Sequence, residues 1–408
     1  MSKRFILTLA TLLIIIGAAG VAILLTKGYT FSSTEKKFVE TGIISVTSLP
    51  DGASVFIDGH LTTATNTTVS QLAPKTYNLK ISKEGYIPWE KNIEVQSGLV
   101  SEVKASLFPA LPTIYPLTFN GVSSALLSPD GQKLAFTVPF IANSPMKQKG
   151  GIWVWTFSSQ PLAFARGAEP RQIAVSVPGL DFSKADLRWS PDSKQLLITL
   201  QENGVEGDAN RRSYLLPFER LTSTADLRDI TPVVNATLKD WEEDQKIKDE
   251  TRILAIKDQK VQQIASASAA LAPAKEKALT VIEWSPDETK FIAGTEAQQN
   301  NKQAKSSSLD LRPVLKGFKV YDVVAGKEFD LPEALAYQWL PDSKHVILIQ
   351  EDRVEIAEYD GSNVAVIYAG SFEGLSVFPW PDSSRIAIIT SFSTPTASVP
   401  NLFGINLK

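Results

Sequence analysis

The sequence predicts a mainly β protein with an N-terminal transmembrane helix, a small β-sandwich and a β-propeller that carries a helical insertion. Three observations predict this fold class: an uncharged apolar stretch near the N-terminus, apolar and polar residues that alternate after residue 41, and one short phrase that recurs five times after residue 112. The 408 residues, 43% hydrophobic and 21% charged, have the composition of a globular protein with about two or three domains. We expect five blades in the propeller, with six as the alternative.

The first predicted element is a membrane anchor. Residues 5–25, FILTLATLLIIIGAAGVAILL, carry no charge, and as a helix rising about 1.5 Å per residue they would cross a bilayer core of roughly 30 Å. A cleaved signal peptide is the alternative, but its apolar region usually has about 7 to 15 residues, and no small-residue cleavage site follows this stretch. The sequence has no cysteine for a lipid anchor. We therefore expect residues 1–26 to form a cytoplasmic N-terminus and an uncleaved anchor in the cell membrane.

The charges beside this stretch predict its orientation. Lys3 and Arg4 precede it and only Lys27 follows closely, which favours a cytoplasmic N-terminus. The bulk of this single-pass protein would then be extracytoplasmic. Residues 27–40 are polar without a clear period and are expected to form a short flexible stalk.

Residues 41–108 are expected to form the β-sandwich. The run GIISVTSLPDGASVFIDG, which begins at Gly42, alternates apolar and polar residues on both sides of a Pro-Asp-Gly turn. The same period of two returns at 77–81 and 91–95. Several short antiparallel strands within one small segment predict two packed sheets.

One turn of this segment carries a recognisable phrase. It consists of Pro50, Asp51, Gly52 and Ala53, and VFIDG follows at once. With this phrase and the later turns, the segment resembles the PEGA domain family, although Asp51 stands where the family name has Glu. The resemblance implies a surface-exposed β module, often beside a membrane anchor, that contacts envelope polymers and has no catalytic residues.

A repeated phrase fills the rest of the chain. It reads LSPDGQKLAF, WSPDSKQLLI, WSPDETKFIA, LPDSKHVILI and WPDSSRIAII, with its proline at positions 129, 191, 286, 341 and 381. Each copy predicts a strand, a type I turn and a second strand, because proline presets φ at the second turn position and Asp suits the next. A third strand follows every copy, for example at 152–157 and 402–407, and a shorter fourth strand follows at positions such as 227–231.

Four-stranded units of this kind bury both faces only by packing on one another, which predicts a propeller over residues 109–408. The last copy ends with its third strand at the C-terminus, whereas residues 113–119 precede the first copy. We expect that early strand to complete the last blade and close the ring. The phrase resembles those of TolB-like and WD-type propellers. Gly131 follows the turn aspartate only in the first copy, and Ser or Glu stands there in the others.

Two residue types recur with the phrase. The aspartates are Asp130, Asp192, Asp287, Asp342 and Asp382. We interpret them as turn residues and not as metal ligands, since each belongs to a different blade and can bind its own backbone. The tryptophans are Trp189, Trp284, Trp339 and Trp380. We interpret them as packing between blades, with a ligand site as the alternative.

Residues 233–277 are the predicted helical insertion. No Gly or Pro interrupts 233–271, and apolar residues recur there at helical spacing, which predicts an amphipathic helix or a helical hairpin. The residues expected to contact a partner are Trp241, Ile247, Leu254, Val261 and Ile264. Packing of the helix on its own propeller is the alternative. Long polar loops are expected on one face of the ring, at 141–151, 201–212 and 294–313, and would mark the binding face.

Composition and motifs argue against several classes of function. A net charge of −3 offers no basic excess for nucleic acid. No catalytic, metal-binding or cofactor motif is recognisable, and His60 and His345 are expected to be structural. We therefore predict a non-enzymatic binding or scaffold protein of the cell envelope, with polysaccharide, peptidoglycan or another envelope protein as its partner. Two alternatives stay open: an accessory subunit of an envelope assembly that docks through 233–277, and a carbohydrate-active enzyme that uses carboxylates.

Overall fold

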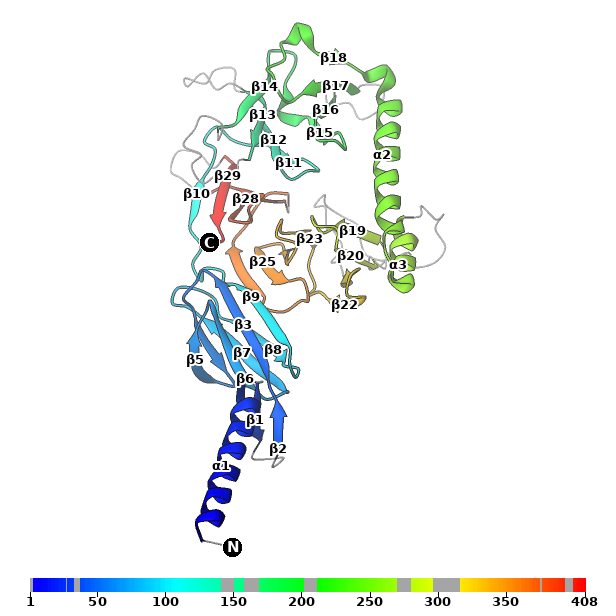
Figure 1. Cartoon of the computed structure of the whole chain (residues 1–408). Coiled ribbons are helices and arrows are strands. Elements are labelled where there is room, and N and C mark those ends of the chain that lie inside the picture. The colour runs from blue at the N-terminus through cyan, green and yellow to red at the C-terminus, as the bar shows by residue number, and fades with distance from the viewer. Residues whose placement is uncertain are drawn as a thin grey trace, which may run out of the picture. The chain divides into compact units, whose positions relative to one another are not determined.

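The chain is built mainly from antiparallel β-strands (Figure 1). The computed structural model describes residues 3–26, 28–32, 37–140, 150–157, 169–201, 211–269, 280–295, 316–374, 376–392 and 399–408. The chain divides into two compact units, one of Met1–Leu111 with the terminal Lys408 and one of Pro112–Leu407. The three predicted polar loops lie largely outside the described residues.

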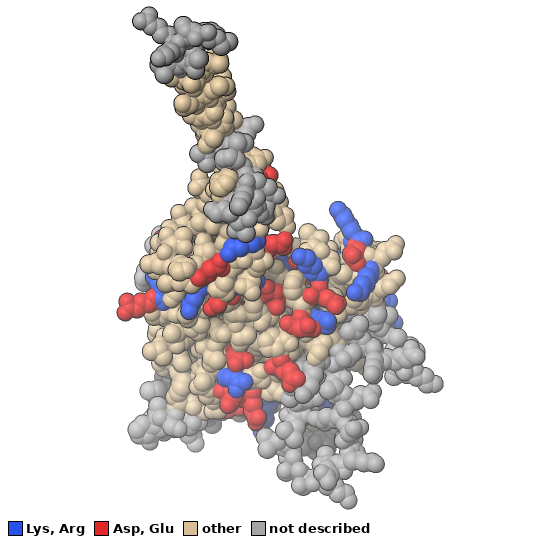
Figure 2. Space-filling model, turned by 90° about the horizontal axis from the view of Figure 1, so that it is seen from below, with Lys and Arg blue, Asp and Glu red and all other residues tan. Residues whose placement is uncertain are grey.

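The apolar N-terminal stretch lies in the helix α1 (Lys3–Thr26). Its side chains are described from Thr8 to Ile23 and at Thr26, and all of these are exposed. Figure 2 shows no charged residue along this part of the helix. Within the described part of the chain, no helix combines the length and the hydrophobicity that a membrane span requires. The helix itself is present, and its role as an anchor stays a prediction.

Residues 27–40 contain regular structure, which corrects the prediction of a flexible stalk. The strands β1 (Tyr29–Ser32) and β2 (Lys37–Glu40) pair antiparallel, with Phe31 opposite Phe38. Both segments contain aromatic or β-branched residues, which favour an extended and paired backbone. The polar composition of the whole segment hid this preference of its two ends.

Two packed sheets form the predicted β-sandwich. Its strands are β3 (Gly42–Leu49), β4 (Ser54–Ile57), β5 (His60–Ala64), β6 (Thr67–Leu72), β7 (Thr76–Ser82), β8 (Trp89–Glu94) and β9 (Val100–Ser106). One sheet has the order β6-β3-β9, with β9 parallel to β3, and the other has the order β5-β4-β7-β8. Alternate residues of both sheets, among them Ile44, Val55, Leu79 and Ile81, fill the core between them.

The phrase from Pro50 to Ala53 forms the turn between β3 and β4. Gly52 has a φ of 67°, a left-handed conformation that glycine adopts without steric cost. Ala53 is fully buried, and its N–H donates a hydrogen bond to Thr65 Oγ1 at 3.0 Å. The phrase therefore fixes the point at which the chain crosses from one sheet to the other.

Among the described residues, five four-stranded antiparallel sheets make up the second unit. The first sheet contains β11 (Ser124–Leu127), β12 (Lys133–Val138), β13 (Gly151–Thr156) and β14 (Arg171–Val175). The second contains β15 (Asp186–Trp189), β16 (Gln195–Gln201), β17 (Arg211–Pro217) and β18 (Arg228–Asp229). The third contains β19 (Thr280–Trp284), β20 (Lys290–Thr295), β21 (Lys316–Asp322) and β22 (Lys327–Asp330).

The fourth sheet contains β23 (Ala336–Trp339), β24 (His345–Ile349), β25 (Arg353–Glu358) and β26 (Ala365–Ala369). The fifth contains β27 (Val377–Pro379), β28 (Arg385–Thr390), β29 (Asn401–Asn406) and β10 (Ile114–Pro116). Of the short 3-10 helices, η1 (Phe182–Lys184) precedes β15, η3 (Thr224–Asp226) lies between β17 and β18, and η4 (Thr231–Val233) follows β18. Each sheet contains one copy of the repeated phrase, and the number of blades in a ring stays a prediction.

The hydrophobic core of this unit lies between neighbouring sheets. Ile152 of the first sheet and Leu196 of the second belong to one buried cluster. Phe136 of the first sheet joins Trp380 of the fifth in another, and the third and fourth sheets share a cluster around Trp339. Packing of sheet on sheet follows from the apolar residues on both faces of the inner strands, which one four-stranded sheet cannot bury alone.

The fifth sheet joins the two ends of this unit. The strand β10 pairs with β29, with Tyr115 opposite Gly404. A Cβ at Gly404 would lie 2.7 Å from the Tyr115 ring, so glycine leaves the room that this ring needs. Arg385 Nη1 donates a hydrogen bond to the Tyr115 hydroxyl at 2.9 Å. The prediction that a strand within 113–119 completes the last sheet is confirmed.

The helical insertion consists of two helices, α2 (Val234–Leu254) and α3 (Gln259–Ala269). Asp258 precedes α3 and its Oδ1 accepts the N–H of Val261 at 3.0 Å, which caps the second helix. The buried residues of this region pack with Phe291 and Tyr321 of the third sheet. They are Ile253, Ile256, Val261 and Ala265. The C-terminal part of the insertion therefore packs on its own domain, which was the alternative to partner docking.

Candidate binding cavity

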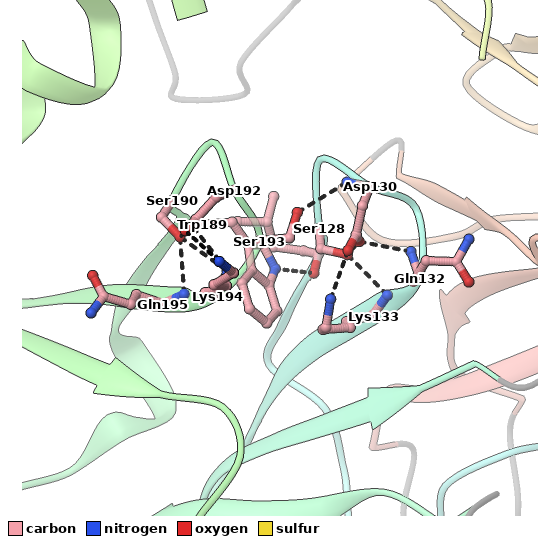
Figure 3. Close-up of polar contacts among 11 residues, drawn as sticks. Ser128, Asp130, Gln132, Lys133, Trp189, Ser190, Asp192, Ser193, Lys194 and Gln195 are labelled. Atoms are coloured by element: carbon pink, nitrogen blue, oxygen red, sulfur yellow. Dashed lines mark hydrogen bonds and ion pairs between the residues drawn. The ribbon is translucent and has the colours of Figure 1, made fainter. Parts of the chain in front are cut away.

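The repeated phrase builds the same turn in successive sheets (Figure 3). In the first sheet, Asp130 Oδ1 accepts the N–H of Gln132 at 3.0 Å, and Ser128 Oγ accepts the N–H of Lys133 at 2.9 Å. In each of the other four copies the turn aspartate likewise accepts the N–H of the residue two positions later. These aspartates are Asp192, Asp287, Asp342 and Asp382. The geometry agrees with turn chemistry for all five carboxylates.

These hydrogen bonds favour the ionised carboxylates. The Ser190 hydroxyl is the main cause that holds the pKa of Asp192 below its usual value. Burial raises the pKa of Asp342, but the hydrogen bond from His345, at 2.7 Å, and two backbone N–H groups outweigh it and lower the pKa. His345 is itself buried beside this turn, which fits the structural role predicted for it.

The residue after each turn aspartate has a left-handed backbone. Gly131, with a φ of 66°, adopts this conformation without steric cost. Its counterparts in the other sheets have φ values from 54° to 59°, although none is glycine. They are Ser193, Glu288, Ser343 and Ser383. The structure therefore imposes on four side chains a conformation that favours glycine.

We expect Ser383→Gly to raise the free energy of unfolding by up to about 1 kcal/mol, because the left-handed conformation costs a non-glycine residue roughly 1–2 kcal/mol. No hydrogen bond to the Ser383 hydroxyl is present in the part of the chain that the structure describes. Ser193→Gly is the matched control, since it relieves the same strain but removes the Oγ that accepts the Asp130 N–H at 3.1 Å. Urea unfolding of the full chain measures both variants, and a destabilised Ser383→Gly contradicts the expectation.

Tryptophans beside the turns join neighbouring sheets. Trp189 Nε1 donates to the Leu126 carbonyl of the preceding sheet at 3.1 Å, as Figure 3 shows in part. Trp339 Nε1 makes the same contact with the Glu283 carbonyl at 3.3 Å. Trp380 belongs to the buried cluster shared with the first sheet. Packing between sheets, predicted for these three tryptophans, is confirmed.

Serine hydroxyls join the same sheets at the turns. Ser193 Oγ accepts the N–H of Asp130, and Ser343 Oγ accepts the N–H of Asp287, each at 3.1 Å. The serine after a turn aspartate thus reaches back to the turn of the preceding sheet. This contact links the first sheet to the second and the third to the fourth.

The third sheet uses its corresponding residues differently. Glu288 stands where Ser193 and Ser343 stand in the other sheets, and its Oε1 lies 2.7 Å from Nη2 of Arg252 in α2. The Arg252 guanidinium also lies 5.9 Å from the centre of the Trp284 ring. The positions that elsewhere contact a preceding sheet therefore contact α2 here.

The helix α2 connects the second sheet to the third (Figure 1). At its N-terminal end η4 precedes the helix directly, and farther along α2 Glu242 lies 3.7 Å from Arg188 of β15. At its C-terminal end, Ile253 is buried against the third sheet. Residues 242–248 between these ends are all exposed. A helix that is polar and solvated around its middle is typical of a bridge between two packed bodies.

The turns and α2 enclose a cavity of about 810 Å³. Turn residues of the first, third, fourth and fifth sheets line it, together with α2 and α3. Gln245 and Lys248 of α2 line this space, as do Glu283 of β19 and Gln338 of β23. Its size lies in the range of roughly 300–1,000 Å³ that small-molecule sites occupy, and its wall mixes polar groups with proline and tryptophan rings.

Glu283 is the most strongly perturbed carboxyl group in the cavity wall. It lies half-buried in β19, and its Oε2 accepts the Trp339 N–H at 3.1 Å. Burial raises the pKa of Glu283 to about 7, and the hydrogen bond from Trp339 only partly opposes this rise. Within the described residues, no cation forms an ion pair with Glu283.

The five residues predicted to contact a partner do not share one face. Trp241 is half-buried and lines a second cavity of about 720 Å³ beside α2. Ile247 and Leu254 are 57% and 77% exposed, whereas Val261 is buried and Ile264 packs beside it. Of the two predicted forms, one long helix or a helical hairpin, the structure has two helices, because α2 ends at Leu254 and α3 begins at Gln259. Docking of a partner through this region stays a prediction.

Sequence reasoning missed Glu283 and Arg252. The signal for Glu283 was its position in TVIEW, where one acidic residue interrupts an apolar strand before the repeated turn phrase. Arg252 carried no signal, because Glu288 and Trp284, which it contacts in the third sheet, lie far from it in the sequence. Among the described residues, no group of three His, Asp or Glu side chains is placed to hold a metal ion.

Comparison with known proteins extends to both units. Similar solved structures include the putative TolB from Agrobacterium tumefaciens, at 14% identity over 68% of this chain and 76% of that chain, with a TM-score of 0.23. TolB from Acinetobacter baumannii is 13% identical over 82% of this chain and 60% of that chain, with a TM-score of 0.24. The AfRom2 CNH domain is 9% identical over 72% of this chain and 100% of that chain, with a TM-score of 0.30. TolB proteins are thus among the similar structures, as the repeated phrase predicted.

These TM-scores are low, and the arrangement of the second unit rests on its own sheets and their pairing. No curated protein matches the sequence. A family model described as PEGA domain matches residues 41–110, which confirms the resemblance inferred from the phrase at Pro50 to Ala53. The match to the PEGA domain family covers residues 41–110 of this chain.

Proposed function

We propose that this protein is a non-enzymatic binding or scaffold protein of the cell envelope. Residues 1–26 would anchor it in the membrane, and the PEGA domain and a five-bladed propeller would be extracytoplasmic. The observation that carries the proposal is the order of the parts: an apolar helix, then a PEGA domain, then a unit whose turns surround a cavity. The PEGA resemblance implies contact with envelope polymers.

The anchor is supported by the side chains of α1. Leu13, Ile14 and Ile15 are 62%, 70% and 64% exposed, and successive exposed apolar residues surround the helix on all sides. Water would solvate such a helix poorly, since burying one leucine or isoleucine side chain contributes about 1.5–3 kcal/mol. A lipid bilayer removes this cost, and Lys3 and Arg4 favour a cytoplasmic N-terminus.

The turn carboxylates support a binding function without catalysis. They are engaged by backbone N–H groups, serine hydroxyls and lysines, and these contacts leave them structural. Glu283 lies in the cavity wall with its hydrogen bond to Trp339, and no second carboxylate is paired with it in the described structure. A cavity with one perturbed carboxyl group suits recognition better than glycoside hydrolysis, which uses two.

Membrane fractionation of cells that produce the full chain tests the proposal. We expect the protein to stay in the membrane pellet after an alkaline carbonate wash, and a protease added to spheroplasts to digest everything beyond residue 27. The variant Leu13→Arg/Ile16→Arg is expected to leave the pellet, since each arginine at the centre of a span costs about 2.5–3.5 kcal/mol. Ser2→Arg is the control, because it adds charge outside the apolar stretch. Recovery of the unaltered chain in the soluble fraction contradicts the anchor, and release of soluble sugars from envelope polymer contradicts the non-enzymatic function.

A further inference from the structure

We propose that the cavity between α2 and the turns binds a cationic side chain, an arginine or lysine presented by a partner polypeptide, with the Glu283 carboxylate as its ion-pair partner. This inference rests on the proposed binding function and names the ligand class of the same unit. It does not depend on the membrane anchor.

Most charged side chains in the cavity wall already form ion pairs. Arg252 binds Glu288 at 2.7 Å and Asp249 at 3.3 Å, so this cation already serves two carboxylates. Asp130 binds Lys133 at 2.7 Å. Glu283 is the carboxylate of the wall that lacks an ion pair in the described structure.

The balance of charge favours a cation. The wall holds four carboxylates, of Asp130, Asp249, Glu283 and Glu288, against the two cations of Lys248 and Arg252. Lys248 lies on the exposed middle of α2, where water solvates it. An anionic ligand would therefore meet a wall of net negative charge, whereas an ammonium or guanidinium group would neutralise part of it.

The apolar part of the wall suits the stem of such a side chain. Pro286 and Pro341 line the cavity from the third and fourth sheets, and Trp284 and Trp339 line it as well. Lysine and arginine carry three or four methylene groups behind the charged head, and these pack on apolar rings while the head reaches a carboxylate. An arginine head would also gain from the aromatic rings, as Arg252 does over Trp284.

The ionisation of Glu283 supports the same ligand class. Its pKa of about 7 reflects burial without a compensating cation, so a bound cation would draw the carboxyl group into its charged form. The charged groups that line the same cavity are Asp130, Lys248, Asp249, Arg252 and Glu288. Of the carboxylates among them, Asp130 has a pKa below its ordinary value, because its hydrogen bonds outweigh its burial. The charge of Glu283 thus changes near neutral pH.

Isothermal titration calorimetry on the full chain in detergent micelles tests the proposal. The probes are acetyl-Gly-Arg-Gly-amide and acetyl-Gly-citrulline-Gly-amide, which have nearly the same shape and differ in charge. At pH 8 we expect the citrulline peptide to bind at least about tenfold more weakly, since a charged hydrogen-bonded pair contributes roughly 1.5–3 kcal/mol. At pH 6 we expect the arginine peptide to bind about tenfold more weakly than at pH 8, because most Glu283 is then protonated.

Two variants make the assignment specific. Glu283→Gln keeps the oxygen that accepts the Trp339 N–H, and it is expected to bind both peptides equally weakly at either pH. Glu351→Gln is the matched control at an exposed position outside the cavity, and it is expected to bind like the unaltered chain. Equal binding of the two peptides by the unaltered chain, or arginine binding that survives in Glu283→Gln, overturns the proposal.

A third probe separates the sources of the cation. Chitosan oligomers carry ammonium groups on sugars, and binding of these oligomers in preference to the arginine peptide would assign the cavity to a polymer and overturn the polypeptide proposal. Such a result would leave the proposed function in place. Loss of the protein from the membrane pellet, in contrast, would defeat the anchor and leave the cavity assignment untouched.

Discussion

Replacing Trp339 by alanine is expected to lower the free energy of unfolding by about 3–5 kcal/mol, the largest effect of any single substitution considered for this chain. Trp339 is 2% exposed and belongs to the cluster shared by the third and fourth sheets. Its indole N–H also donates to the Glu283 carbonyl of the neighbouring sheet. The substitution would leave a cavity and an unpaired carbonyl in the same place. Urea unfolding followed by tryptophan fluorescence measures the change.

Two control variants test whether the loss of stability comes from the buried packing of Trp339. Trp339→Phe keeps most of the buried volume and is expected to lose less stability, while Trp241→Ala, at a half-buried position of α2, is expected to change it by less than about 1 kcal/mol. If Trp339→Ala folds as stably as the unaltered chain, the interpretation of the repeated tryptophans as packing residues fails at this position.

Glu283→Gln is expected to raise the free energy of unfolding above pH 7 by up to about 3 kcal/mol, and to have little effect below pH 4.5. Burial raises the pKa of Glu283 from 4.5 to about 7, so the folded state holds a proton that the unfolded state has already released. Stability contributed by this group is therefore present below pH 4.5 and is lost as the pH rises to 7. Glutamine does not ionise and keeps its contribution at every pH.

The measured quantity is the difference in the free energy of unfolding between Glu283→Gln and the unaltered chain. The contributions of the turn aspartates are the same in both proteins and cancel. The pKa values of Asp192 and Asp287 are lowered, so their contribution is lost on the acid side, in the opposite direction to that of Glu283. Urea unfolding at pH 4.5, 6 and 8 gives the difference at each pH. A difference that is constant over this range would show that Glu283 titrates alike in the folded and unfolded chains.

Local turn chemistry made most of the second unit predictable from sequence. The Pro-Asp phrase determines a hairpin without help from the rest of the fold, because proline and aspartate act on their own backbone. Five such phrases identified all five inner hairpins, and the unmatched strand near residue 114 identified the closing pair. In the sequence, the position after the turn aspartate departs from glycine in four of the five copies. The structure shows that Ser193 and Ser343 use this position for contacts between sheets.

Features that depend on distant partners were not predictable. The spacing of Ile247, Leu254 and Val261 suggests one helix face, but Asp258 caps a new helix and the face divides. The raised pKa of Glu283 arises from sheets and helices that approach it in space, and a glutamate in a short apolar strand carries no such information by itself. The strands β1 and β2 were missed because four-residue pairs give too few alternations to stand out from a polar segment.

The pairing of β10 with β29 has a consequence for biogenesis. Ile114 lies opposite Ile405, so the fifth sheet cannot be completed until β29 (Asn401–Asn406) has left the ribosome. Contacts between residues this far apart in sequence form slowly, and unpaired strand edges invite aggregation and proteolysis in the meantime. A product that stops before residue 401 would lack β29 and leave both β10 and β28 with open edges. Proteolytic quality control would recognise incomplete copies by these exposed strands, whereas pairing with β29 covers the same edges in finished copies.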